Sequence, residues 1–332
     1  MKWIKIIFIT VLLLVVIYFI GPHPATPNYS TTLPNVPSSA KELIQFVQQE
    51  ELKHTIKPNN EARIIWNNDS LKNKTDYAIV YLHGFSASQQ EGSPVHDAIA
   101  KQFGCNLYLA RLSQHGIDTT EELVNLTPEN YWQSAQEAYA IGKQLGKKVI
   151  LMGTSTGATL ALQLASVYPE IAGIILLSPN IEINDPNAWL LNNAWGLQIA
   201  RLVLHSNYKD VANDKPDYKQ YWNTHYRLEA VVSLEELIET TMTNATFKKI
   251  QQPMLLLYYY KDPLHQDNVV KVSAMLQMFN AVATPDSLKI KMPIPNAGNH
   301  VLASPIVSKD IETPKKEIAK FLTQTMHLSI HN

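Results

Sequence analysis

The chain has 332 residues, of which 45% are hydrophobic and 17% charged, and its formal net charge is −1. This length allows one large or two ordinary globular domains with an ample core, and the near-zero charge gives no basis for binding nucleic acid. Cys105 is the only cysteine, which excludes an intramolecular disulfide and a zinc site built from several cysteines.

The chain opens with an apolar segment. Residues 6–20 carry no charge and follow Lys2 and Lys5. Such a segment predicts either an uncleaved single-pass anchor, with the rest of the chain outside the cytoplasm, or a signal sequence whose cleavage would give a secreted or periplasmic protein. The anchor is favoured, because the Gly21-Pro22-His23-Pro24 stretch is a poor cleavage site. Residues 1–21 are therefore assigned to an N-terminal transmembrane helix or signal sequence.

Residues 22–60 form a linking region between this segment and the main domain. Five prolines lie among residues 22–37, which predicts an extended tether. Ser39 followed by Glu42 has the pattern of a capping box, so we expect a helix to begin there and to end near Pro58.

The main domain is expected from residue 61 to residue 332. Apolar strands alternate there with amphipathic helices, which predicts a mostly parallel sheet with helices on both faces. Residues 183–248 interrupt this alternation and are interpreted as an inserted helical cap. We call them the cap segment; they contain three of the six tryptophans, Trp189, Trp195 and Trp222.

A G-x-S-x-G motif, Gly153-Thr154-Ser155-Thr156-Gly157, lies between an apolar strand and a helix rich in small residues. This context predicts a nucleophile elbow, a sharp turn with a strained serine at its tip. The glycines remove side chains that would clash in so tight a turn. The N–H of Thr156, at the start of the helix, could stabilise an oxyanion.

A serine hydroxyl becomes a good nucleophile when a base takes its proton and an acid orients that base. Asp262 lies just past the apolar strand expected at residues 254–260, and His300 lies in a loop beyond the following strand. Because the carboxyl ends of parallel strands meet at one edge of a sheet, we expect Ser155, Asp262 and His300 to lie together.

Five short motifs occur in order between residues 60 and 325: His83-Gly84-Phe85, Arg111-Leu112 with His115-Gly116, Gly153–Gly157, Tyr260-Lys261-Asp262 and Gly298-Asn299-His300. In order and spacing they resemble the α/β-hydrolase family. The similarity is to its capped branch of monoglyceride-lipase-like and carboxylesterase-like enzymes, which also includes serine aminopeptidase-like members. The resemblance implies an α/β-hydrolase fold that carries the cap segment.

The resemblance also implies the roles of the site residues. Ser155 would be the nucleophile, Asp262 the acid and His300 the base, and the backbone N–H groups of Phe85 and Thr156 would form the oxyanion hole. The chain departs from the branch at Tyr260, where many members have glycine, and in the residues after Asp262, so Asp267 remains an alternative acid. His83 and His115 are interpreted as structural. No motif for a metal, dinucleotide or nucleotide occurs, so no cofactor is expected.

The sequence therefore predicts a serine hydrolase that cleaves carboxylic esters, small or lipid, through an acyl-enzyme on Ser155. A peptidase or amidase of the same fold is the alternative, and a non-catalytic binding protein is a more distant one. A peptidase that binds a free amine needs carboxylates near the site. Glu235, Glu236 and Glu239 cannot all face one pocket at their helical spacing. The oligomeric state stays open.

Overall fold

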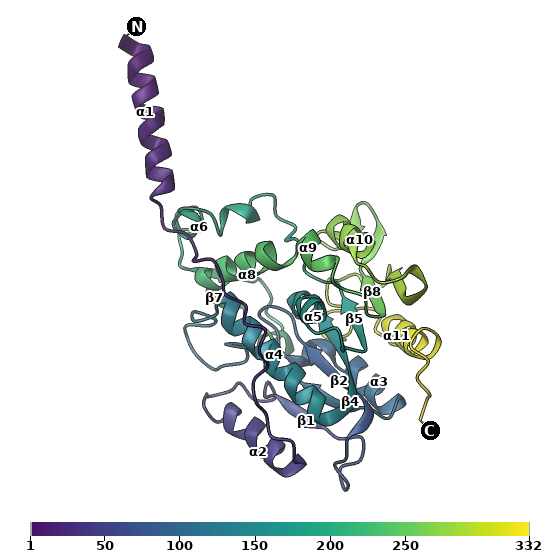
Figure 1. Ribbon diagram of the computed structural model, residues 1–332. Coiled ribbons are helices and arrows are strands. Elements are labelled where there is room, and N and C mark those ends of the chain that lie inside the picture. Colours follow the sequence, from purple (N-terminus) through teal and green to yellow (C-terminus); the bar gives the residue numbers. More distant parts are fainter. Residues whose placement is uncertain (1, 332) are drawn as a thin grey trace.

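A seven-stranded sheet forms the centre of the protein in the computed structural model, which describes residues 2–331 (Figure 1). The strand order is β1-β3-β2-β4-β5-β8-β11; β1 runs antiparallel to β3, and all other neighbours are parallel. The strands are β1 (Arg63–Ile65), β2 (Thr75–Leu82), β3 (Asn106–Leu109), β4 (Gly146–Thr154), β5 (Gly173–Leu177), β8 (Met254–Tyr258) and β11 (Lys289–Pro293).

Helices cover both faces of this sheet, as the sequence predicts. Successive residues of a strand point to opposite faces, so Val80 joins one apolar core and its neighbour Ile79 joins the other. The first core lies under α4 (Pro128–Leu145), α5 (Thr156–Val167) and α10 (Val272–Ala281). The second lies under α3 (Val95–Gln102) and α11 (Glu312–Gln324). The predicted α/β architecture is confirmed.

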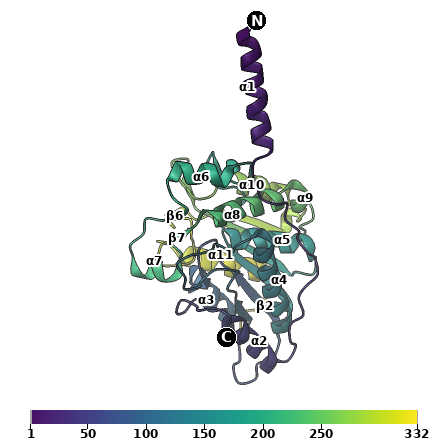
Figure 2. The same cartoon turned by 90° about the vertical axis from the view of Figure 1, so that its left-hand side faces the viewer.

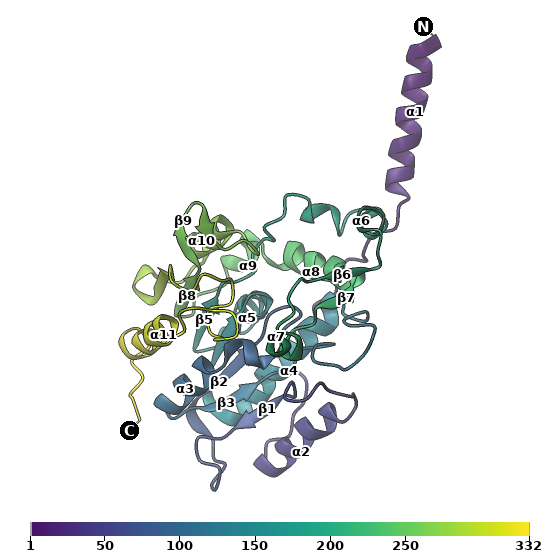
Figure 3. The same cartoon turned by 180° about the vertical axis from the view of Figure 1, so that it is seen from behind.

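The cap segment lies between β5 and β8 and is not purely helical. Its strands β6 and β7 pair in an antiparallel ribbon, which the sequence analysis did not predict. Figure 3 shows α6 and α8 on the side of the molecule from which α1 projects. The elements of the cap segment are η2 (Ala188–Leu190), α6 (Gly196–Leu204), β6 (Tyr208–Asp210), α7 (Pro216–Tyr221), β7 (His225–Arg227), α8 (Leu228–Thr241) and α9 (Asn244–Phe247).

The N-terminal helix α1 (Lys2–Phe19) projects away from the domain (Figure 2). It has 18 residues with a mean hydropathy of 2.3, and none of its side chains is buried. Its length and composition suit a membrane span, and a signal sequence has the same properties. The indole N–H of Trp195 donates to the carbonyl of Ile17, 2.9 Å away, so the end of α1 meets the cap segment.

The proline-rich tether is extended, as predicted, but it lies against the domain. In Figure 1 it runs from α1 past α8 and α4 towards α2. The Trp132 indole donates to the Ser30 carbonyl at 2.7 Å, and the Tyr168 hydroxyl donates to the Thr31 carbonyl at 2.9 Å. Tyr29 also packs on the first core.

Helix α2 (Ala40–Glu51) begins at the predicted cap, because the Ser39 hydroxyl accepts the Glu42 N–H. It ends well before Pro58, where the sequence analysis expected its end. The backbone of residues 55–57 instead bonds to the loop at residues 116–118.

Strand β8 is also shorter than the apolar run at residues 254–260 suggests. It ends at Tyr258, and the chain then forms a hairpin of β9 (Tyr260–Asp262) and β10 (His265–Gln266). Two short 3₁₀ helices complete the secondary structure: η1 (Gln89–Gly92) and η3 (Asp286–Leu288).

Candidate active site

Ser155 occupies a sharp turn between β4 and α5, as the G-x-S-x-G motif predicts. Its φ of 52° and ψ of −120° lie in a region that costs a non-glycine residue conformational energy. A Cβ at Gly157 would lie 2.0 Å from the Leu82 carbonyl oxygen, and one at Gly153 would lie 2.6 Å from the Gly157 oxygen. Both positions therefore require glycine. The Ser155 N–H donates to the Leu177 carbonyl at 2.9 Å, which ties the turn to β5.

His300 is paired with Asp267. The His300 Nδ1 lies 2.6 Å from the Asp267 Oδ2, and the two residues are 8% and 2% exposed. The other carboxylate oxygen, Oδ1, accepts the N–H groups of Val269 and Val270 at 2.9 and 3.1 Å. These contacts fix the orientations of the Asp267 carboxylate and of the His300 ring.

The pKa of His300 reflects two opposing effects. Burial lowers it, but the charge and hydrogen bond of Asp267 and the charge of Glu91 outweigh burial, so the pKa lies above its ordinary value. The other ring nitrogen, Nε2, has no hydrogen-bond partner among residues 2–331. It is the nitrogen that would accept a proton from a nucleophile.

The expectation that Asp262 orients His300 is wrong. Asp262 lies in the β9–β10 hairpin, where its Oδ1 accepts the N–H groups of Leu264 and His265 at 3.0 and 2.9 Å. Its carboxylate also pairs with the His265 ring at 2.9 Å. The hairpin carries Asp262 away from the sheet and brings the chain back at Asp267, whose N–H donates to the Tyr259 carbonyl. The carboxylate that bonds His300 is therefore that of Asp267.

The loop after β2 contains one amide that has no acceptor among the described residues. The Gly84 N–H donates to Glu91, and the Ser86 N–H donates to the His115 ring at 3.0 Å. Between them lies Phe85, whose N–H has no acceptor among the described residues. Thr156 opens α5, so its N–H has no acceptor within the helix either. These are the two amides expected in the oxyanion hole.

His83 and His115 hold this loop in place. The His83 Nδ1 bonds the Gly84 carbonyl at 2.9 Å, and its Nε2 accepts the Leu112 N–H at 3.0 Å. Burial lowers the pKa of His83 to about 4 and the pKa of His115 well below its usual range. Both rings are fully buried and bonded to backbone groups, as expected for structural histidines.

The cap segment contacts both loops of the site. Trp222 is buried against Ala87, two residues after Phe85, and against Val301, the neighbour of His300. The ring of Phe85 packs edge-on against Tyr226 with centroids 5.2 Å apart. The sequence analysis placed Trp222 in the cap segment without predicting these contacts, since its partners lie far away in the chain.

A cavity of about 490 Å³ lies between the cap segment and α10. Glu235 and Glu239 both line it, whereas Glu236 does not; the Asn192 amide donates to both Glu236 and Glu239 at 3.0 Å. The helical spacing therefore keeps the three glutamates from facing one pocket together, as expected, although Glu235 and Glu239 do share a cavity. Neither Ser155 nor His300 lines this cavity.

Residues 74–292 match the family described as serine aminopeptidase, S33. The matched stretch is more than half of the chain and includes the elbow at Ser155. The chain belongs to this family. The resemblance to monoglyceride-lipase-like α/β-hydrolases is confirmed.

Similar proteins include lipases. A stretch of 105 residues is 31% identical to the thermostable monoacylglycerol lipase of Bacillus sp. (strain H-257), and it spans 32% of this chain and 41% of that lipase.

Two solved structures share the fold. One is described with LipS and LipT, two metagenome-derived lipolytic enzymes; it has a TM-score of 0.64 and 17% identity, over 81% of this chain and all of that chain. The other is a monoacylglycerol lipase of Paleococcus ferrophilus, with a TM-score of 0.58 and 14% identity over 81% of this chain and 98% of that one. At these identities the structures establish the α/β-hydrolase fold.

Proposed function

We propose that the protein is a serine hydrolase of carboxylic esters, esterase-like or lipase-like, with Ser155 as nucleophile, His300 as base and Asp267 as acid. The observation that carries the proposal is the buried His300–Asp267 pair, joined at 2.6 Å. Its two residues follow β11 and β8 at the end of the parallel sheet at which the strained Ser155 follows β4. Asp267 takes the role that the sequence analysis gave to Asp262.

The reaction would follow from this arrangement. The Nε2 of His300 takes the Ser155 hydroxyl proton as the oxygen attacks the ester carbonyl, and Asp267 stabilises the resulting imidazolium. The N–H groups of Phe85 and Thr156 stabilise the oxyanion. Collapse expels the alcohol and leaves an acyl-enzyme, which water then hydrolyses with His300 again as base. No cofactor is needed for any of these steps.

An ester is favoured over a peptide with a free N-terminus. A buried ammonium needs carboxylates beside it. Glu235 and Glu239 face a cavity that neither Ser155 nor His300 lines, so they give no support to an amine site at the nucleophile. The residues of the cap segment that meet the catalytic loops, Trp222 and Tyr226, are aromatic and suit an acyl chain.

Hydrolysis rates of matched substrates test this proposal. We expect p-nitrophenyl butyrate or octanoate to be hydrolysed with kcat/KM of at least about 10⁴ M⁻¹s⁻¹. Alanyl- and prolyl-nitroanilides should be at least about a hundredfold slower. Faster cleavage of the anilides, with KM raised selectively by Glu235→Gln or Glu239→Gln, would instead establish an aminopeptidase.

A further inference from the structure

Glu91 is a buried carboxyl beside the nucleophile, and no step above uses it. It is 2% exposed, and its Oε2 accepts the Gly84 N–H at 2.6 Å. A Cβ at Gly84 would lie 2.9 Å from the Glu91 Oε1 and 3.0 Å from the Ser155 Cβ. The carboxyl and the nucleophile thus lie on the same side of the Gly84 backbone.

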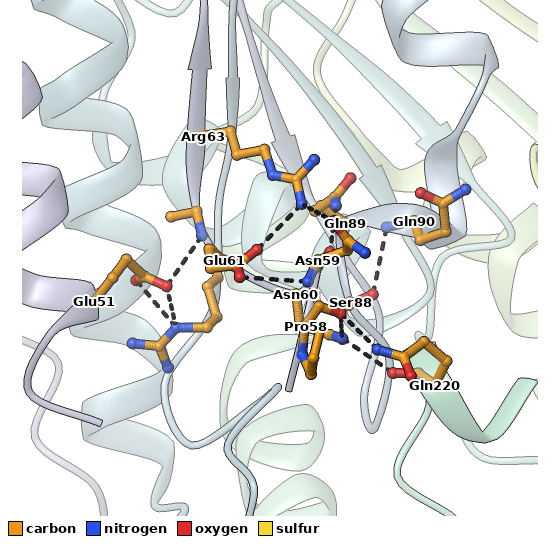
Figure 4. A network of polar contacts seen from close by, with 12 residues as sticks. Glu51, Pro58, Asn59, Asn60, Glu61, Arg63, Ser88, Gln89, Gln90 and Gln220 are labelled. Atoms are coloured by element: carbon orange, nitrogen blue, oxygen red, sulfur yellow. Dashed lines mark hydrogen bonds and ion pairs between the residues drawn. The ribbon is translucent and has the colours of Figure 1, made fainter. Parts of the chain in front are cut away.

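The short helix η1 that carries Glu91 is held firmly in place. The Gln89 side chain donates to the Asn59 carbonyl at 3.0 Å, and the His96 ring bonds the Gln89 carbonyl at 2.9 Å (Figure 4 shows Gln89 with Asn59). A Cβ at Gly92 would lie 2.4 Å from the Tyr81 ring, so η1 packs directly on β2. Glu91 is therefore presented by a rigid support.

The surroundings of Glu91 make a carboxyl an unexpected choice there. Burial raises its pKa to about 7, although the Gly84 N–H, the charge of His300 and the Tyr81 hydroxyl each lower it. Burial and, to a smaller extent, the charge of Glu91 raise the pKa values of Tyr131 and Tyr218. A glutamine could accept the same hydrogen bond without a buried ionisable group.

We propose that Glu91 is a positioning residue: it holds the Gly84 peptide, and with it the loop whose Phe85 N–H meets the oxyanion. The inference rests on the proposed function. Because the Gly84 N–H is bonded to Glu91 and the Ser86 N–H to His115, neither is available to the substrate, and the Phe85 N–H between them has no acceptor among residues 2–331.

Three variants of the full-length protein test this role. Glu91→Leu removes the acceptor and the charge, Glu91→Gln keeps the acceptor and removes the charge, and Gln90→Leu is a control in the same helix. The kcat and KM for p-nitrophenyl butyrate are measured from about pH 5 to 9. Labelling with a fluorophosphonate and thermal unfolding are measured alongside.

We expect Glu91→Leu to lower kcat about 10–100-fold with KM little changed, since the lost contact acts on the oxyanion. Glu91→Gln should recover most of kcat, because its side-chain oxygen can accept the same Gly84 N–H. Gln90→Leu should match the wild type.

A Glu91→Gln variant as slow as Glu91→Leu, or a Glu91→Leu variant with full kcat, would overturn the inference. A raised KM at unchanged kcat would do the same, because it would make Glu91 a substrate-binding group. Failure of the proposed function would look different: the wild type itself would neither hydrolyse the ester nor react with the fluorophosphonate.

Discussion

Among single residues, Asp267 should matter most to the basicity and orientation of His300. Asp267→Asn keeps the shape but cannot stabilise an imidazolium, and it favours the wrong ring tautomer. We expect kcat for p-nitrophenyl butyrate to fall by about 10⁴. Asp262→Asn is the matched control, since Asp262 bonds only within its hairpin, and it should stay within about threefold of the wild type. A larger loss at Asp262 than at Asp267 would return the role to Asp262.

The pH dependence of the rate is a second test at this scale. Because Asp267 and Glu91 outweigh burial, the pKa of His300 lies above its ordinary value. Activity requires the neutral ring, so the rate should rise with pH through a midpoint above about 6.5. A rate that is constant from about pH 5 to 8 would contradict a histidine base.

Ser155 and His300 could be singled out from sequence because each stands in a short motif directly after a strand. Asp267 could not be chosen over Asp262 in this way. The apolar run Met254–Tyr260 looks like one strand ending at an acid, and nothing in it reveals the hairpin that follows Tyr258. The sequence analysis did not single out Glu91, because its side chain bonds the backbone N–H of Gly84, and such a partner leaves no pattern in the sequence.

At the scale of elements, the cap segment stabilises the loops on which the site depends. Trp222 is 4% exposed against Ala87 and Val301, whereas Trp189 in the same segment is 52% exposed. We expect Trp222→Ala to lower the free energy of unfolding by about 3 kcal/mol, as for other buried tryptophans, and to lower ester hydrolysis. The measurement is urea unfolding together with kcat/KM.

Trp189→Ala is the control for this comparison and should change stability by less than about 0.5 kcal/mol. Equal effects of the two substitutions would show that Trp222 does not support the catalytic loops.

Helices and strands with a strong period of apolar residues could be predicted from the sequence, but contacts made through backbone carbonyls could not. The alternation of strands and helices predicted the sheet and its two covered faces. The docking of the tether depends on Trp132 and Tyr168 reaching the carbonyls of Ser30 and Thr31. A carbonyl has no sequence signature, so these proline-rich residues were predicted only to be extended.

For the whole molecule, α1 and the docked tether would place the domain beside a membrane if α1 stays attached. We expect the full-length protein to remain with membranes after a high-pH wash, because α1 exposes an apolar surface on every side. The N-terminal sequence of the mature protein is measured in parallel. Soluble protein that begins near residue 25 would show that α1 is a cleaved signal sequence.

The central claim is that Ser155 is the nucleophile of an ester hydrolase, and covalent labelling tests it most directly. The full-length protein and its Ser155→Ala variant are treated with a fluorophosphonate, and the labelled peptide is identified by mass spectrometry while ester hydrolysis is followed. We predict one label, on Ser155, in step with loss of hydrolysis, and a variant that is unlabelled and about 10⁵–10⁶-fold slower. A label on another residue, with the Ser155→Ala variant still active, would contradict the account.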